Sequence, residues 1–423
     1  ALVIGFGQLD LDTAKRLALR GGVLLLLVWA VTCLVLFTIP FTFPSYESAS
    51  FFSDALVEPP QTFAITEIYF TANPFHSLAN AVVPAVVLFS SMLGIGLIGL
   101  NDRDRLLSTL RVVNEAVIRI TKFVVSLTPL GVLAIGAVTA GTMTGETLQR
   151  LEVYLITFAA AAILLTFWIL PLLVTAATPF SYREVLRVGR DAMLTAFVAN
   201  NAFIVLPILV ERSKELLREH DLGSQDSDSA ADILIPVLFN FPNAGRLLTL
   251  LFIPFAAWLA GDALGAGRYP TLFLVGISSY FAKAQVALPF LLDLMGLPHD
   301  LFQLYIPTTI LGGKFDSMVT AMNLLAFALL GAGALAGFLE LRLWRLVRAG
   351  LLIVAGIVIT VVILQPTLAA LVDTTYHRDE ALRSMHARRD ISSAIVHREH
   401  VAAGLSDDRT GSILDRIRTR GTL

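Results

Sequence analysis

Polar side chains interrupt four long apolar runs of this chain, and their chemical types are those that bind small charged solutes. The interruptions lie at residues 199–202, 240–246, 283–285 and 314–323. Amides donate and accept hydrogen bonds, and the lysines, the arginine and the aspartate can pair with a carboxylate or an amine. Hydrocarbon offers no hydrogen bonds, so each group needs a partner from the protein, from water or from a solute. The pattern therefore predicts a solute site between helices.

The residues expected to form this site are the amides and charges of the four segments. An ionisable side chain at bilayer depth costs about 2.5–3.5 kcal/mol on insertion scales, so it usually marks a pathway or a binding site. We predict that the substrate is bound by Asn200, Asn201, Asn243, Arg246, Lys283, Gln285, Asp316 and Asn323.

These residues also have a structural interpretation that involves no solute. Asn200 and Asn201 can join two helices through amide hydrogen bonds, as asparagines do in membranes. Asp316 can form a structural ion pair with Lys314 or Arg246. Lys283 can extend its long stem to the outer surface. The sequence leaves these alternatives open.

The composition indicates an integral membrane protein. Of 423 residues, 56% are hydrophobic and 15% are charged, whereas soluble domains carry about 25% charged residues. A net charge of −2 gives no electrostatic reason to expect nucleic-acid binding. The single cysteine, Cys33, can form no internal disulfide. The sequence has no phosphate-binding loop, dinucleotide fingerprint or nucleophile elbow, and its histidines lack metal-ligand spacing. We expect neither an enzyme nor a bound cofactor or metal.

Long apolar stretches predict the transmembrane helices. A helix needs about 20 apolar residues to cross the hydrocarbon core. We expect helices over residues 15–39, 77–100, 106–140 and 151–177, and a last one over residues 351–364 that closes the membrane part.

Two shorter stretches, residues 191–210 and residues 271–294, predict hairpins that enter the membrane and leave on the same side. Amides, a lysine or a proline interrupt each of them. Each is followed by a helix that we expect to be broken, over residues 233–259 and residues 301–338. Two such units are typical of inverted repeats, and broken backbone is tolerated where it lines a cavity. Both hairpin tips should therefore meet near the middle of the bilayer.

The distribution of Lys and Arg predicts the orientation. Most loop cations lie on one side if the cytoplasmic loops are residues 10–20, 101–111, 183–190, 211–218 and 342–348. The last helix then runs outward, which places residues 365–423 on the external side. We expect a multi-pass protein of a bacterial-type cytoplasmic membrane. Ala1 and Leu423 both look like cut ends, so we expect a fragment of a longer protein.

Several motifs resemble those of one transporter family. Residues 73–100 look like the entry into its fourth transmembrane region, and residues 126–132, Ser-Leu-Thr-Pro-Leu-Gly-Val, are similar to its fifth-helix motif. Residues 192–197 and 206–207 frame a first hairpin, whose tip is Ala-Asn-Asn-Ala here and serine-rich in the family. The chain thus resembles the dicarboxylate/amino acid:cation symporter family, the glutamate-transporter-like proteins, over residues 1–338.

The resemblance implies the fold class. It is an all-α polytopic fold with two re-entrant helical hairpins and broken helices, here with one extra C-terminal transmembrane helix. In this family a mobile domain moves as an elevator against a trimeric scaffold. The implied parts are scaffold-type and early transport helices in residues 1–190, a transport core in residues 191–338, and the extra helix in residues 339–372.

The resemblance also implies roles for particular residues. Asp316 matches an aspartate that holds a substrate amino group, while Asn240 and Asn323 match asparagines near a cation site. Val319 stands where acidic-amino-acid transporters have a substrate-binding arginine, and Phe327 stands where they have a sodium-binding aspartate. The coupling ion, Na⁺ or H⁺, therefore stays open.

Three fixed positive charges, Arg246, Lys283 and Lys314, lie near the places where the family binds cations. This suggests proton-coupled or uncoupled transport. The function we expect is secondary transport of a small organic anion, dicarboxylate or amino acid. The alternative is a non-transporting receptor that anchors an external module.

The end of the chain carries a second, shorter resemblance. Residues 412–423 look like the opening of extracytoplasmic solute-binding proteins. We therefore expect residues 373–423 to be an external connector that leads to a solute-binding module. The expected partners are this module, membrane lipid, the solute and two further copies in a homotrimer.

Overall fold

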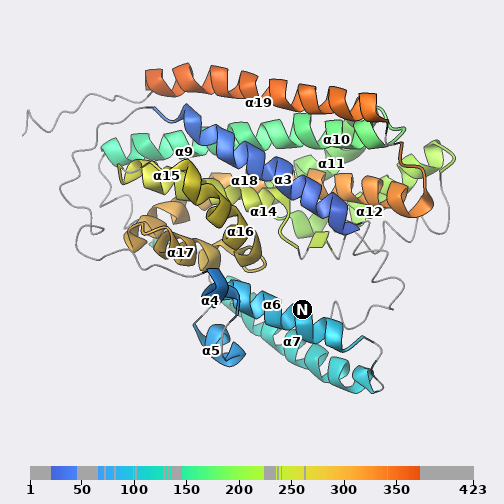
Figure 1. Cartoon of the computed structure of the whole chain (residues 1–423), viewed down its shortest axis with the longest axis horizontal. Helices are drawn as coiled ribbons and strands as arrows, with labels where there is room; N and C mark the ends of the chain where they lie inside the picture. Colours follow the sequence, from blue (N-terminus) through green and yellow to red (C-terminus); the bar gives the residue numbers. More distant parts are fainter. Residues whose placement is uncertain are drawn as a thin grey trace, which may run out of the picture. The chain divides into compact units, whose positions relative to one another are not determined.

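The computed structural model describes about three quarters of the chain, and these residues form helices joined by turns, with no strand among them (Figure 1). The described residues are 21–44, 65–70, 73–80, 82–98, 100, 102–126, 130, 133, 134, 137, 141, 145–222, 235, 238, 239, 241–261, 263–340 and 342–371. The expectation of an all-helical membrane protein is confirmed. Four helical segments are long and apolar enough to cross a membrane: Gly22–Thr42, Leu151–Ala177, His299–Ala334 and Leu343–Leu371.

The first described helices differ in one respect from the prediction. The single span expected over residues 77–100 is wrong, because the structure has a short helix, a turn at Asn80 and a second helix. Pro84 explains the turn: it lacks an N–H, and its ring clashes with the carbonyl four residues earlier. The helices of this part are α3 (Gly22–Thr38), η2 (Ile39–Thr42), α4 (Ile65–Tyr69), α5 (Pro74–Ala79), α6 (Val83–Gly96) and α7 (Arg103–Ser126).

The next apolar segment is one continuous helical rod with a wider turn near its middle. It consists of α9 (Gly145–Leu164), the π-helical turn η4 (Leu165–Ile169) and α10 (Leu170–Ala177). Pro171 has no N–H to give to the Phe167 carbonyl one turn earlier. The Tyr182 hydroxyl donates a hydrogen bond to that carbonyl instead. The π-turn is thus stabilised by a side chain from the next helix.

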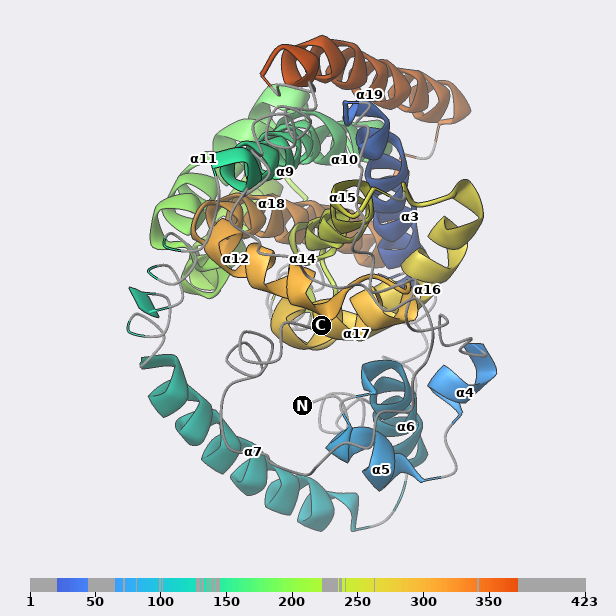
Figure 2. The same cartoon turned by 90° about the vertical axis from the view of Figure 1, so that its left-hand side faces the viewer.

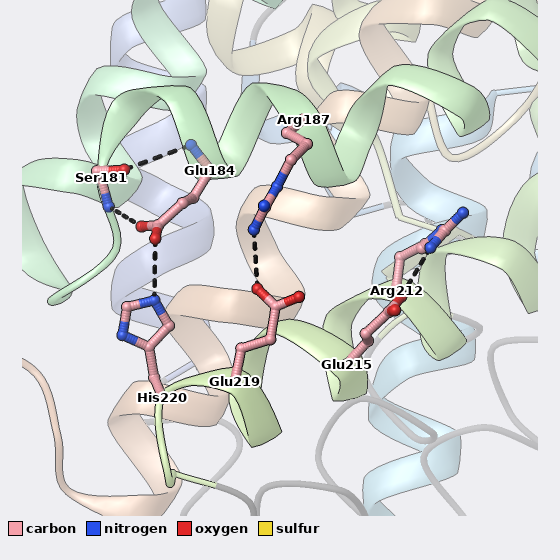
Figure 3. A network of polar contacts seen from close by, with 7 residues as sticks. All are labelled: Ser181, Glu184, Arg187, Arg212, Glu215, Glu219 and His220. Atoms are coloured by element: carbon pink, nitrogen blue, oxygen red, sulfur yellow. Dashed lines mark hydrogen bonds and ion pairs between the residues drawn. The ribbon is translucent and has the colours of Figure 1, made fainter.

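The first predicted hairpin is present as two helices joined at Asn200. Its arms are α11 (Tyr182–Ala199) and α12 (Leu206–Glu219), with the short turn η5 (Ala202–Val205) between them. Ion pairs join the arms in antiparallel order, as Figure 3 shows in part. They are His220–Glu184 at 3.4 Å, Arg187–Glu219 at 2.8 Å and Arg212–Asp191 at 3.1 Å. The start of α11 and the end of α12 therefore lie side by side at the base of the hairpin.

The base of this hairpin predicts a pH dependence of stability. The Ser181 backbone N–H donates to the Glu184 carboxylate at 2.8 Å, and this bond holds the pKa of Glu184 below its ordinary value, with help from His220. A carboxyl whose pKa is lowered by folding stabilises the fold above its unfolded pKa, about 4.3, and loses this effect as the pH falls through the folded value. We expect Glu184→Gln to lower the melting temperature of the purified protein at pH 7, and we expect this difference from wild type to shrink as the pH falls below about 4.3. Glu211→Gln, an exposed carboxylate on the same hairpin, is the control; equal pH profiles for both variants would contradict the prediction.

The broken helix and the second hairpin follow. Residues 241–243 are not helical, and Asn243 begins a new helix by accepting a hydrogen bond from the Arg246 N–H at 3.1 Å. The second hairpin turns at residues 280–283, and at its base Arg268 Nη1 donates to the Met295 carbonyl at 3.4 Å. The elements of this part are α14 (Ala244–Leu248), η6 (Thr249–Leu251), α15 (Phe252–Leu259), η7 (Ala266–Arg268), α16 (Tyr269–Ser279) and α17 (Ala284–Leu294).

The last two helices correct the prediction for residues 301–338. That segment is not broken: after η8 (His299–Leu301), α18 (Phe302–Ala336) is one helix of 35 residues. Its central glycines and polar side chains keep their backbone N–H groups, and Pro307 lies only in the second turn, where it removes one hydrogen bond. The closing helix α19 (Leu343–Leu371) is longer than the expected residues 351–364. α18 lies in the core, in contact with α9, α10, α11, α12 and α14.

Candidate functional site

The tip of the first hairpin lies against the middle of α18. Asn200 adopts the left-handed backbone conformation, with φ 52°, and ends α11. A Cβ atom on Gly313 of α18 would be 2.6 Å from the Asn200 Oδ1 atom, so the amide occupies the space that a side chain would need. Asn201 turns its side chain to the Phe203 N–H, at 3.0 Å. Asn200 therefore reaches α18, while Asn201 stabilises the turn itself.

The break before α14 lies one helical turn further along α18. Asn243 is 2% exposed, and its Oδ1 atom accepts a hydrogen bond from Thr320 Oγ1 at 2.8 Å. The same Thr320 hydroxyl is 3.2 Å from Asp316 Oδ1. Its single proton therefore faces two acceptors, the Asn243 amide oxygen and the Asp316 carboxylate. The Asn243 Nδ2 atom is buried and has no hydrogen-bond partner in the structure. The two N–H groups of this amide therefore lack a partner among the described residues.

The backbone of the break lies directly against Asp316 at Gly245. A Cβ atom on Gly245 would be 2.4 Å from the Asp316 carbonyl oxygen and 2.5 Å from its Oδ1 atom. Only glycine fits there. The next residue, Arg246, is half-buried, interacts with the charge of Asp316 and lies over the Phe239 ring at 5.1 Å. A cation thus lies near the Asp316 carboxylate at the start of α14, although no ion pair joins the two among the described residues.

Asn323 lies two turns beyond Asp316 on α18. It is 1% exposed, and neither its Oδ1 nor its Nδ2 atom has a hydrogen-bond partner in the structure. An unsatisfied buried polar group costs about 1–3 kcal/mol, so a fully unpaired amide is a candidate ligand of a solute, an ion or water.

The second hairpin reaches the same break from its other side. The ring of Phe281, at the hairpin tip, lies 5.4 Å from the ring of Phe241, and Phe203 of the first hairpin lies 5.7 Å from Phe239. Lys283 and Gln285 follow at the start of α17 and are exposed.

The structure therefore divides the predicted site residues into three sets. Asn200, Asn243, Arg246, Asp316 and Asn323 lie along one stretch of α18 and the break beside it. Asn201, Lys283 and Gln285 belong to the hairpin tips, and among the described residues no hydrogen bond or ion pair joins them to Asp316. Asn240 lies outside the described residues. The binding roles of all of them stay predictions.

Sequence reasoning missed four residues that shape this region. Thr320 lies one turn after Asp316, a spacing that places both side chains on one face of a helix. Gly245 and Gly313 supply close approach, and Trp29 of α3 donates its indole N–H to the Pro242 carbonyl at 2.6 Å. The Thr320 spacing is visible in the sequence, whereas the long-range partners of the glycines and of Trp29 are not.

The fold and this site define a class. The described residues form a multi-pass helical membrane protein in which two helical hairpins and an interrupted helix pack around a long central helix, α18 (Figure 2). The comparison with family models agrees: residues 1–334 match the sodium:dicarboxylate symporter family. The chain belongs to this family, which confirms the resemblance noted in the sequence.

One curated relative is a transport protein. The chain is 26% identical over 153 residues to the L-cystine uptake protein TcyP of Shouchella clausii (strain KSM-K16). The match covers 34% of this chain and 32% of that protein.

Proposed function

We propose that this protein is a secondary transporter that moves a small organic anion, a dicarboxylate or an amino acid across the cytoplasmic membrane. The observation that carries the proposal is the meeting of both hairpin tips and the α14 break at the middle of α18. A carrier needs a polar site that both sides of a membrane can reach in turn, and such sites are built where helices are interrupted near the midplane.

The two hairpins approach this site from opposite ends of α18. At the base of the first hairpin, the Phe180 ring lies 5.1 Å from His220 and 6.1 Å from Phe338, which follows α18. The second hairpin ends next to η8, immediately before α18 begins. The opposed arrangement supports the inverted-repeat interpretation, in which each hairpin gates one side.

The chemistry of the site supports a solute with a carboxylate and an amine. The free Asn243 Nδ2 donor and the Arg246 guanidinium suit a carboxylate, and the start of α14 adds backbone N–H groups. Asp316 would hold the amine. A cystine-like or other neutral amino acid fits this set, and the relative TcyP is an L-cystine uptake protein.

Transport would proceed by an elevator movement of the body that holds the site. α3 and α9–α10 pack against α14 and α18, so we place them with this body. A homotrimeric scaffold and a fused external solute-binding module complete the proposal. Arg246 would act as a built-in cation beside Asp316, which favours proton-coupled or uncoupled transport over sodium coupling.

The experiment is uptake into proteoliposomes that contain the purified protein. Labelled cystine, neutral amino acids and dicarboxylates are offered with a sodium gradient, with a proton gradient and with neither. We expect uptake without sodium, and its loss in Asp316→Ala. A strict sodium requirement would defeat the coupling proposal. Specific binding without uptake of any solute would favour the alternative of a non-transporting receptor.

A further inference from the structure

The helix α19 lies beyond residues 1–334, which match the family model, and it is attached to the body of the protein at two places. The first is the π-turn η4. The indole N–H of Trp168 donates to the Leu352 carbonyl of α19 at 2.9 Å. A Cβ atom on Gly356, one turn later, would be 2.5 Å from the Trp168 Nε1 atom. The indole therefore lies directly on the backbone of α19, where only glycine leaves room.

The second attachment is at the end of α10. The Glu340 backbone N–H donates to the Ala177 carbonyl at 2.9 Å, which satisfies one of the carbonyls that a helix end leaves open. The Glu340 carboxylate in turn holds Arg345 of α19 at 2.9 Å. The direction of α19 is thus set before its first turn.

One face of α19 is buried against the rest of the protein along most of the helix. The buried positions recur at helical spacing and are Ala349, Ile353, Gly356, Ile357, Leu364 and Leu368. This face contacts α3, η2, α9, η4 and α10, and Figure 1 shows α19 running alongside α9–α10. The opposite face is apolar and exposed, as lipid contact requires; Leu351, Val358 and Val362 are examples.

The π-turn connects this contact to the site. Leu165, Thr166 and Ile169 are buried, whereas Phe167 and Trp168 point outward. η4 also contacts α18, the helix of Asp316 and Asn323. The extra residue that a π-turn inserts rotates the helix surface, and such turns are frequent at functional places. In this protein the π-turn η4 contacts α19 through Trp168 and packs its buried residues against α18.

We propose that Trp168 and Gly356 form a lock that makes α19 part of the body that carries the site, so that α19 and α18 move as one unit. The chain that leaves α19 after residue 371 is then held by the site-bearing body and follows its movements. The lock itself does not depend on the proposed solute or on transport.

The first test compares two substitutions on α19, one at the contact with Trp168 and one away from it. Gly356→Leu places bulk where the indole lies, whereas Gly350→Leu adds the same bulk at a position with nothing within 4 Å. We expect Gly356→Leu to lower the melting temperature of the purified protein by at least about 4 °C, and Gly350→Leu to leave it nearly unchanged. Trp168→Phe, which removes the N–H together with the five-membered ring that lies on Gly356, should also lower the melting temperature. Equal melting temperatures for the two leucine variants would overturn the lock.

The second test measures movement without any need for uptake. Spin labels are placed at Gly350→Cys on α19 and at Gln303→Cys, an exposed position in the first turn of α18, in a Cys33→Ser background. We expect one narrow distance distribution by pulsed electron paramagnetic resonance, unchanged by sodium or by candidate solutes, and broadened by Gly356→Leu. A broad or solute-dependent distribution with the lock intact would show that α19 moves separately and would overturn the proposal. Failure of uptake in proteoliposomes would leave both readouts intact, so the two proposals fail separately.

Discussion

Gly245→Ala will reduce uptake by at least tenfold and will destabilise the protein. The added methyl group would lie 2.4 Å from the Asp316 carbonyl oxygen and 2.4 Å from Thr320 Oγ1, well inside contact distance. The nearest atom belongs to the backbone of a buried helix, so it cannot turn aside. Overpacking of this kind costs typically about 1–3 kcal/mol. The α14 break would have to move away from α18, and Asn243 would lose its bond to Thr320. Uptake into proteoliposomes and thermal unfolding measure the two effects.

Gly265→Ala is the matched control for this prediction. Gly265 precedes η7, has a negative φ and has nothing within 4 Å of the position of a Cβ atom. We expect uptake within about twofold of wild type and an unchanged melting temperature. If both alanine variants behave alike, the close approach of α14 to Asp316 is not needed for function.

Asp316→Asn will abolish uptake, with a loss of at least about a hundredfold, because it removes the only acidic group among the described residues of the site. The substitution keeps the size of the side chain and its acceptor oxygen for Thr320. It also leaves Arg246 without its counter-charge. Arg246 is half-buried, and no ion pair joins it to Asp316 among the described residues, so we expect only a modest loss of folding free energy from the removed charge. Uptake and chemical unfolding should therefore both change.

A double variant separates the two roles of Asp316. Arg246→Gln combined with Asp316→Asn removes both charges. The double variant should therefore lose less folding free energy than the two single variants lose together, by about 0.5–3 kcal/mol. Uptake should stay absent in the double variant, since the group that would hold the amine is still missing. Recovery of uptake would mean that Asp316 serves only to balance Arg246.

The positions of the hairpins could be read from the sequence with useful accuracy. Asn200 was expected at a tip and ends α11 in the left-handed conformation that asparagine tolerates better than most residues. The break near Asn243 was also expected, since Pro242 and a capping asparagine are local signals. Residues 301–338 were misjudged, because polar side chains and glycines in an apolar stretch were taken as a break. α18 keeps its helix through them.

The sequence by itself determined the class of protein, the presence of two hairpins and the break near Asn243. Length, hydropathy and capping are local properties, so they act on each segment before it meets another. Only the tertiary structure decided which polar groups meet: Thr320 and Asn243 are 77 residues apart, and Trp168 meets Leu352 across 184. Such contacts depend on how whole helices pack and on where a glycine allows two backbones to approach. For that reason the site residues were visible in the sequence one by one, while their arrangement around α18 and the attachment of α19 were not.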